Sequence, residues 1–179
     1  MILTVCMDQI LVLFDGSNQI TRRNGNGEKV AEKVKLQAVQ KYSEDLKRKY
    51  RIINPIIFID NSLPRYIDNP EWLWKQINSW KIIKCEKGHE ADEYLIDFLQ
   101  IAPLKTIIIS NDQFRNHKAK IPKICVKIKW RFESRFRGKR FIVPEIKEYL
   151  HYTKLISNSP EFCGDMSLSL LQLTYILEV

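Results

Sequence analysis

Three short polar segments carry carboxylates at positions that a folded α/β protein would bring together. Asp15 follows an apolar run at residues 10–14, and Asp112 lies just beyond a second run at 106–109. Asp92 and Glu93 stand at the start of a predicted helix. Ligands bind at the carboxyl edge of parallel sheets, where these acids would meet. Clustered carboxylates repel one another unless a cation neutralises them, and hard oxygen ligands suit Mg²⁺ or Mn²⁺. Such an ion activates water and offsets charge on a phosphate, so together with a basic surface these acids point to phosphodiester hydrolysis.

Each of these acids also has a simpler structural interpretation. Asp15 alone could stabilise a turn, and Asp60 could simply end a strand. Asp92 or Glu93 could stabilise a helix through its macrodipole, because negative charge is favoured at a helix N-terminus. The pairing of Asp15 with Asp112 favours a site over separate roles, because both follow buried strands at one edge of the expected sheet.

Alternating apolar runs and amphipathic segments predict the elements that position these acids. The first run is uninterrupted, as expected for the central strand of a parallel sheet that is buried on both faces. Strand, helix and strand in this order imply a parallel crossover. The predicted strands are residues 10–14, 56–59, 82–85 and 106–109, and the predicted helices are 30–50, 70–80 and 90–100.

The positive charge of the chain is concentrated in one segment. Residues 118–140 hold ten Lys or Arg and one acid, a net charge of +9, whereas the whole chain carries +8. A local basic patch is typical of nucleic-acid binding, although a solubilising surface is the alternative. Side chains at the ends of predicted loops could assist: Arg22, Arg23 and Arg65. The residues expected to hold the RNA backbone are Lys123, Lys127, Lys129, Arg131, Arg135 and Arg137.

The basic segment has a pattern of its own. Residues 123–130 alternate between apolar and basic side chains, which predicts an edge strand with one wet face. Residues 132–143 predict a basic hairpin around Gly138, and residues 144–150 predict a short helix. The polar stretch at residues 21–29 is expected to be a mobile loop beside the active edge.

The length of 179 residues suits one α/β domain, expected at residues 1–150, with a C-terminal extension at 151–179. The apolar stretch at residues 168–177 needs burial against this domain or a second copy, so a homodimer is one expectation. Four widely spaced cysteines predict reduced thiols in a cytoplasmic protein. No run is long enough to span a membrane, so no membrane partner is expected.

Three motifs in this order resemble those of a known family. D-G-S-N at residues 15–18, A-D-E-Y-L-I at 91–96 and S-N-D-Q-F-R at 110–115 resemble the acidic motifs of PIN-like NYN-domain ribonucleases, above all the Regnase (MCPIP) type. Residues 130–144 resemble the hairpin of that subgroup, so the resemblance covers residues 10–145. It implies a three-layer fold, with a central parallel sheet of strand order 3-2-1-4-5 between helices.

The resemblance also implies Mg²⁺-dependent endonucleolytic cleavage of single-stranded or loop RNA. By position in the motifs, Asp15 and Asp112 would bind the metal, and Asp92 would bind it directly or through water. Asn18 would orient a ligand or a substrate phosphate. Glu93 stands where the subgroup has a second Asp.

Three other functions stay open at this stage. A tRNA-directed PIN nuclease, either toxin-like or acting in 5′ processing, would share the same acids. A catalytically inactive RNA-binding module would keep the carboxylates without binding a metal usefully. An α/β phosphohydrolase of another kind would need a nucleophile or a Gly-rich phosphate loop, and the sequence contains neither in convincing form.

Overall fold

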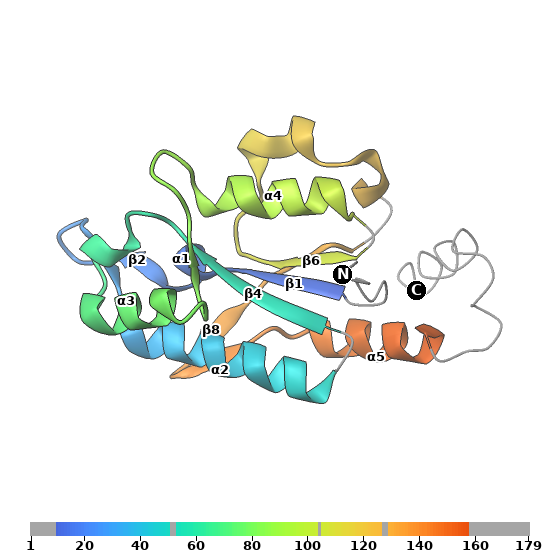
Figure 1. The fold of residues 1–179 in the computed structure, drawn as a ribbon, viewed down its shortest axis with the longest axis horizontal. Helices are drawn as coiled ribbons and strands as arrows, with labels where there is room; N and C mark the ends of the chain where they lie inside the picture. The colour runs from blue at the N-terminus through green and yellow to red at the C-terminus, as the bar shows by residue number, and fades with distance from the viewer. Residues whose placement is uncertain (1–9, 51–52, 104, 127–128, 158–179) are drawn as a thin grey trace, which may run out of the picture.

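The computed structural model describes residues 10–50, 53–103, 105–126 and 129–157. Among them, five parallel strands form one sheet of order β5-β4-β1-β6-β7 (Figure 1). Numbered along the chain, these strands have the order 3-2-1-4-5, so the predicted topology is confirmed. The strands are β1 (Ile10–Asp15), β4 (Ile53–Ile59), β5 (Ile83–Lys84), β6 (Thr106–Ile109) and β7 (Arg131–Phe132).

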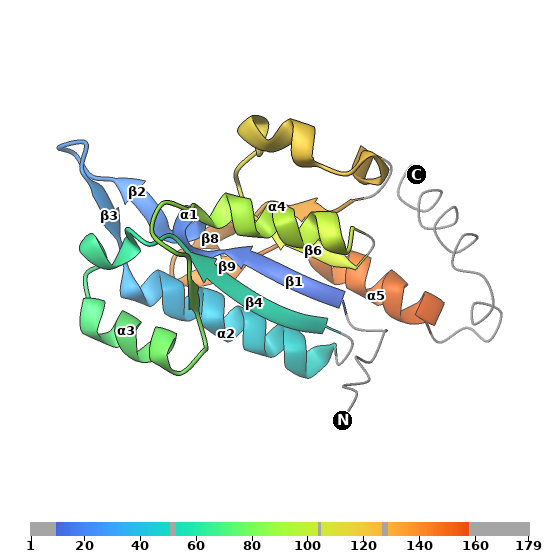
Figure 2. The same ribbon diagram turned by 45° about the horizontal axis from the view of Figure 1, so that its top comes forward.

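Helices cover both faces of the sheet and complete three layers (Figures 1 and 2). One face carries α2 (Lys33–Lys49), α3 (Pro70–Asn78) and α5 (Ile146–Ser157). The other carries α4 (Ala91–Ile101) and two 3₁₀ segments, η2 (Arg115–Lys120) and η3 (Lys123–Val126). Short α1 (Gly16–Ile20) and η1 (Leu63–Arg65) follow the carboxyl ends of β1 and β4. Asn69 caps α3 as a preceding polar residue should, because its side chain accepts from the Trp72 amide.

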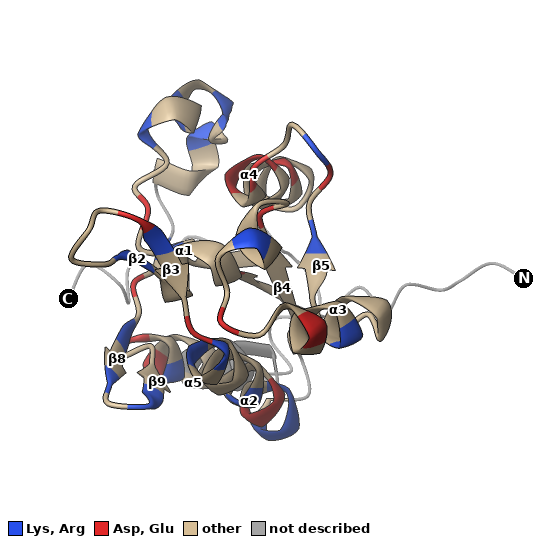
Figure 3. Ribbon diagram, turned by 90° about the vertical axis from the view of Figure 1, so that its left-hand side faces the viewer, with Lys and Arg blue, Asp and Glu red and all other residues tan. Residues whose placement is uncertain are grey.

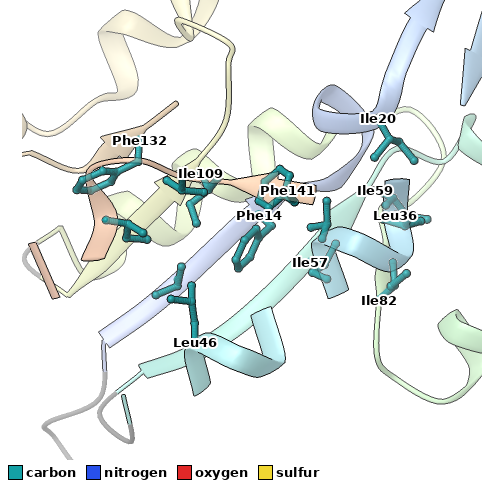
Figure 4. Close-up of a cluster of buried hydrophobic side chains, with 14 of the residues drawn as sticks. Phe14, Ile20, Leu36, Leu46, Ile57, Ile59, Ile82, Ile109, Phe132 and Phe141 are labelled. Atoms are coloured by element: carbon teal, nitrogen blue, oxygen red, sulfur yellow. The ribbon is translucent and has the colours of Figure 1, made fainter. Parts of the chain in front are cut away.

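The side chains of β1 alternate between two hydrophobic clusters, one on each face. Val12 and Phe14 belong to the cluster under α2 and α5, and both are fully buried. Figure 4 shows Phe14 in this cluster, with Leu46 of α2. Leu13 points to the other cluster, with Leu95 and Ile96 of α4. The uninterrupted apolar run predicted this burial on both faces. Burial also specifies the register of β1 against its neighbouring strands.

The polar stretch after α1 is a hairpin rather than the expected mobile loop. Its strands are β2 (Thr21–Arg23) and β3 (Lys29–Ala31), paired antiparallel. The side chain of Asn24 accepts from the amides of Asn26 and Glu28, which closes the turn, and Gly27 supplies a positive φ of 80°. Local side-chain bonds of this kind give a polar segment regular structure without a hydrophobic signal.

The predicted edge strand at residues 123–130 is wrong in its described part, because residues 123–126 form η3. Ile124 and Trp130 pack with the α4 cluster, and Cys125 is buried there. Ile124 and Trp130 of the apolar half therefore reflect packing of an irregular segment over α4, whereas Val126 is 87% exposed. The sheet gains β7 only at residues 131–132. The expected hairpin is confirmed as β8 (Arg135–Arg137) paired with β9 (Arg140–Ile142).

Two further expectations are confirmed only for some of their residues. The helix predicted at residues 70–80 ends at Asn78 as α3, and Trp80 beyond it is 86% exposed. Cys85 and Cys125 are free and buried, whereas the other two cysteines lie outside the described residues. The C-terminal stretch at 158–179, with its proposed dimer contact, also lies outside them. None of the described helices is both apolar enough and long enough to cross a membrane.

Candidate active site

Asp15 is a buried carboxylate held in place at both oxygens. Its side chain is at the end of β1, and the residue is only 2% exposed. Oδ1 accepts from the Asn18 amide at 3.0 Å, which caps α1, and Oδ2 accepts from the Ser110 hydroxyl at 2.9 Å. A carboxylate fixed by two donors cannot rotate freely, so its position is set by the ends of β1 and β6.

Gly16 allows this close packing at the end of β1. A Cβ at this position would lie 2.9 Å from the Phe58 carbonyl oxygen and 2.9 Å from Cγ2 of Ile57. The glycine is therefore needed for close approach to β4, and not for a left-handed turn. Ser17 adds a second link to β4, because its hydroxyl accepts from the Asp60 amide at 2.8 Å.

Asp112 is positioned by the turn that follows β6. Its amide donates to the Ser110 hydroxyl at 3.0 Å, and its Oδ1 accepts from the Phe114 amide at 2.6 Å. Ser110 is fully buried and bonds both acids, so Asp15 and Asp112 are connected through one hydroxyl. The turn bond of Asp112 uses Oδ1 and leaves Oδ2 for a ligand.

The start of α4 brings Asp92 to the same place. The Asp60 side chain accepts from the Ala91 amide at 2.9 Å, so Asp60 caps α4 from the end of β4. Asp60 thus has a structural role, while Asp92 is half-buried beside it. Glu93 departs from the expected cluster, because its carboxylate bonds the ring of His89 at 2.7 Å.

A cavity of about 300 Å³ lies among these acids at the carboxyl end of the sheet. Sequence reasoning placed Asp15, Asn18, Asp92 and Asp112 there, and all of them line it, whereas Glu93 does not. Lys29 is the one cation that lines this cavity among the described residues, and it had been assigned to a loop without a role. The lining residues are Asp15, Ser17, Asn18, Thr21, Lys29, Asp60, Tyr66, Glu90, Asp92 and Asp112.

The crowding of acids raises two pKa values. Burial, with the charges of Asp92 and Asp60 added, raises the pKa of Asp15 from 3.8 to about 8. Burial and the charge of Asp112 raise the pKa of Asp92 from 3.8 to about 6, although His117 acts in the opposite direction. A bound cation would favour the charged form of both groups, as expected for carboxylates at a candidate metal site.

The donors suit a hard divalent cation, although they do not form a ready-made cage. Within the part of the chain that the structure describes, no three His, Cys, Asp or Glu side chains are gathered closely enough to hold a metal ion. Mg²⁺ is commonly held by one or two carboxylates, with water and substrate phosphates completing its shell. Asp15 and Asp112, which line one cavity, fit that sparser arrangement.

A network of amide side chains, with Gln19 buried and Asn18 and Asn111 exposed, connects the acid cavity to the basic hairpin. The Asn111 amide donates to Oδ1 of Asn18 at 3.2 Å, and the Asn111 side chain accepts from the Ser134 amide at 2.9 Å. Gln19, which sequence reasoning missed, donates to the Ile109 carbonyl at 3.2 Å and accepts from the Ser134 hydroxyl. Gln19 had no sequence signal of its own beyond its place after D-G-S-N.

The candidate RNA-binding residues fall into two groups. Lys123, Arg135 and Arg137 are exposed, on η3 and β8. Lys129 instead pairs with Glu145, and Arg131 pairs with Glu133 at 3.2 Å. Arg131 also donates to the Ser110 carbonyl at 3.3 Å, which ties the start of the basic segment to the active-site turn.

The remaining candidates lie around the β2–β3 hairpin and η1. Arg22 pairs with Glu32 at 2.9 Å, and Arg23 donates to the Gly27 carbonyl at 2.6 Å. Arg65 is exposed on η1, whereas Lys127 lies outside the described residues. Figure 3 looks at the carboxyl end of the strands and shows the basic residues of the β8–β9 hairpin and of the segment after β6 on one side of the molecule.

No family model matches the chain, and no curated protein matches its sequence.

Proposed function

We propose that the chain is a divalent-metal-dependent endoribonuclease of the PIN-like NYN type, acting on single-stranded or loop RNA. One observation carries the proposal: a buried Asp15, bonded to Ser110, lines a cavity with four other carboxylates at the carboxyl edge of a parallel sheet. The exposed basic residues of the adjoining hairpin support a polyanionic substrate.

The residues of the chain have distinct roles in this proposal. Asp15 and Asp112 would hold the Mg²⁺ or Mn²⁺ ion, and Asp92 would support it directly or through water. The ion, when bound, would activate water and offset the charge on the phosphate. Asn18 would orient a substrate phosphate from the cavity rim, and Lys29 would contribute positive charge beside it. Arg135, Arg137 and Lys123 would hold the RNA backbone through charge.

The experiment is a cleavage assay on several end-labelled RNAs with Mg²⁺, Mn²⁺ or EDTA. The proposal expects internal cuts that require the metal, with unstructured or loop RNA cleaved in preference to duplex. The same panel should include tRNA precursors and mature tRNAs, because selective cleavage of these would indicate a tRNA-directed nuclease instead. The absence of any metal-dependent product at every RNA tested would overturn the proposal.

A catalytically inactive RNA-binding module is the second candidate. It is favoured by the finding that, among the described residues, no three His, Cys, Asp or Glu side chains are close enough to one another to hold a metal ion. RNA binding that is unchanged by EDTA, together with no cleavage in Mg²⁺ or Mn²⁺, would support this candidate.

A further inference from the structure

A second hollow adjoins the acid cavity and shares two of its carboxylates. Its volume is about 390 Å³, within the range of pockets that hold a small organic ligand. Asp92 and Asp112 line both hollows, so they stand at the boundary between the two. The lining residues of the second hollow are Asp92, Asn111, Asp112, Gln113, Phe114, Arg115, Asn116 and His117.

The two hollows differ in their chemistry. The first is lined by five carboxylates and Lys29, whereas the second combines amides with a guanidinium and an imidazole. Amide side chains offer a donor and an acceptor together, which is what the edge of a nucleobase requires. Unpaired bases of RNA are commonly stacked on guanidinium planes and hydrogen-bonded at their edges.

The Arg115 guanidinium is already oriented within the second hollow. Its Nε donates to Oε1 of Gln113 at 2.9 Å, a bond between two exposed side chains that favours one orientation of the guanidinium plane. The bond uses the oxygen of Gln113 and leaves its NH₂ group for a ligand. A guanidinium held in this way loses less freedom when a base stacks on it.

The turn that presents these polar side chains to solvent has a strained backbone at Phe114. Phe114 has a φ of 49°, which is unfavourable for a bulky residue, and its side chain is only 1% exposed. Its ring packs against Trp130 at 5.8 Å between centroids, while Gln113 and Arg115 on either side are exposed. Strain that is retained by tertiary packing is typical of functional turns.

We propose that the second hollow binds one unpaired nucleobase of the RNA substrate, next to the phosphate that lies at Asp92 and Asp112. Gln113 and Asn116 would bond the edge of the base, and Arg115 would stack on its face. This inference rests on the proposed function and adds to it a base preference on one side of the cleaved bond. The cleaved phosphodiester bond would lie at Asp92 and Asp112, between the two hollows.

Binding is tested first without cleavage. Single-stranded tetraribonucleotides of varied sequence are titrated into the ¹⁵N-labelled chain in EDTA, and amide chemical shifts are followed. We expect shifts at Gln113, Asn116 and His117, and binding at least about fivefold weaker in the Gln113→Ala/Asn116→Ala variant. Gln37→Ala, an exposed amide on α2, is the matched control and should bind as the native chain does.

Cleavage of a randomised RNA in Mg²⁺, with sequencing of the ends, tests the preference. The native chain should favour certain bases at one position beside the cut, and the double variant should still cleave but lose that preference. Unchanged binding and unchanged preference in the double variant would overturn the subsite and leave the nuclease proposal intact. No cleavage by the native chain, with binding and shifts as expected, would instead overturn the nuclease and retain a base-binding pocket.

Discussion

The hydroxyl of Ser110 donates to Oδ2 of Asp15 at 2.9 Å, although the two residues are 95 positions apart in the sequence. The bond joins the carboxyl ends of β1 and β6, which are neighbours in the sheet. Because Ser110 also accepts from the Asp112 amide, the same hydroxyl sets the positions of both acids. The geometry of the candidate site therefore depends on the register of two buried strands.

Replacing Gly16 by Ala should destabilise the fold at the active edge. The new Cβ would meet the Phe58 carbonyl oxygen at 2.9 Å, and a backbone atom cannot move aside cheaply. We expect a loss of about 1–3 kcal/mol in the free energy of unfolding, measured by urea denaturation. Gly25→Ala is the control, because a Cβ there has nothing within 4 Å. Equal stability of the two variants would contradict the close approach.

Asp15 should make the metal-free protein less stable as pH rises. Its folded-state pKa of about 8 lies above the ordinary 3.8, so between these values the folded state holds a proton that the unfolded state releases. Stability in EDTA should therefore fall from about pH 4 to about pH 8, by at least about 1 kcal/mol. Thermal melts across this range should show the slope, and Mg²⁺ should reduce it.

The variant Asp15→Asn is the direct check of that slope. The amide carries no charge at any of these pH values, so the variant should lose most of the pH dependence seen in EDTA. Asp97→Asn, on the exposed side of α4, should keep it. An identical pH profile for the native chain and Asp15→Asn would assign the slope to other groups.

Removal of the Gln19 side chain should loosen the basic hairpin from the active site. Gln19 bonds the Ile109 carbonyl and the Ser134 hydroxyl, so Gln19→Ala leaves buried polar groups without partners. We expect a cost of about 1–3 kcal/mol in stability and faster hydrogen exchange at β8 and β9. Gln37→Ala should change neither measurement. Unaltered exchange in the hairpin would mean that the network does not hold it.

The exposed arginines of β8 should contribute charge without contributing to the fold. Arg135→Ala/Arg137→Ala should weaken RNA binding and reduce the slope of log affinity against log salt by about one to two. Its melting temperature should match that of the native chain. Lys41→Ala/Lys47→Ala, a pair of exposed residues on α2, is the control for net charge. Equal losses in the two pairs would indicate a general charge effect.

The apolar runs were sufficient to predict the buried strands and most of the acid cavity, whereas the strand order 3-2-1-4-5 was implied by the resemblance of the three motifs. The uninterrupted apolar runs of β1 and β6 identify two-sided burial; Asp15 is the last residue of β1, and Asp112 follows β6 by three residues. Acids beyond adjacent parallel strands must meet at one edge. The cap of α3 at Asn69 was equally predictable, because it depends on local chemistry.

Residues whose roles depend on tertiary contacts could not be predicted in the same way. Glu93 is adjacent to Asp92 in sequence, but the next position on a helix points elsewhere, and its carboxylate bonds His89. Lys29 reaches the cavity only because the β2–β3 hairpin forms through side-chain bonds. The alternation at residues 123–130 resembled a strand, although Ile124 lies in a 3₁₀ segment and packs, with Trp130, against the α4 cluster.

The proposed function requires that Asp15 and Asp112 jointly hold a divalent cation that drives RNA cleavage. The most direct test is the cleavage rate of Asp112→Asn in Mg²⁺ and Mn²⁺, measured beside Asp97→Asn. The amide oxygen can still accept from the Phe114 amide, so the turn should persist and RNA binding should be retained. We predict cleavage at the level of the EDTA background for Asp112→Asn and native cleavage for Asp97→Asn. Native-level, metal-dependent cleavage by Asp112→Asn would contradict the account.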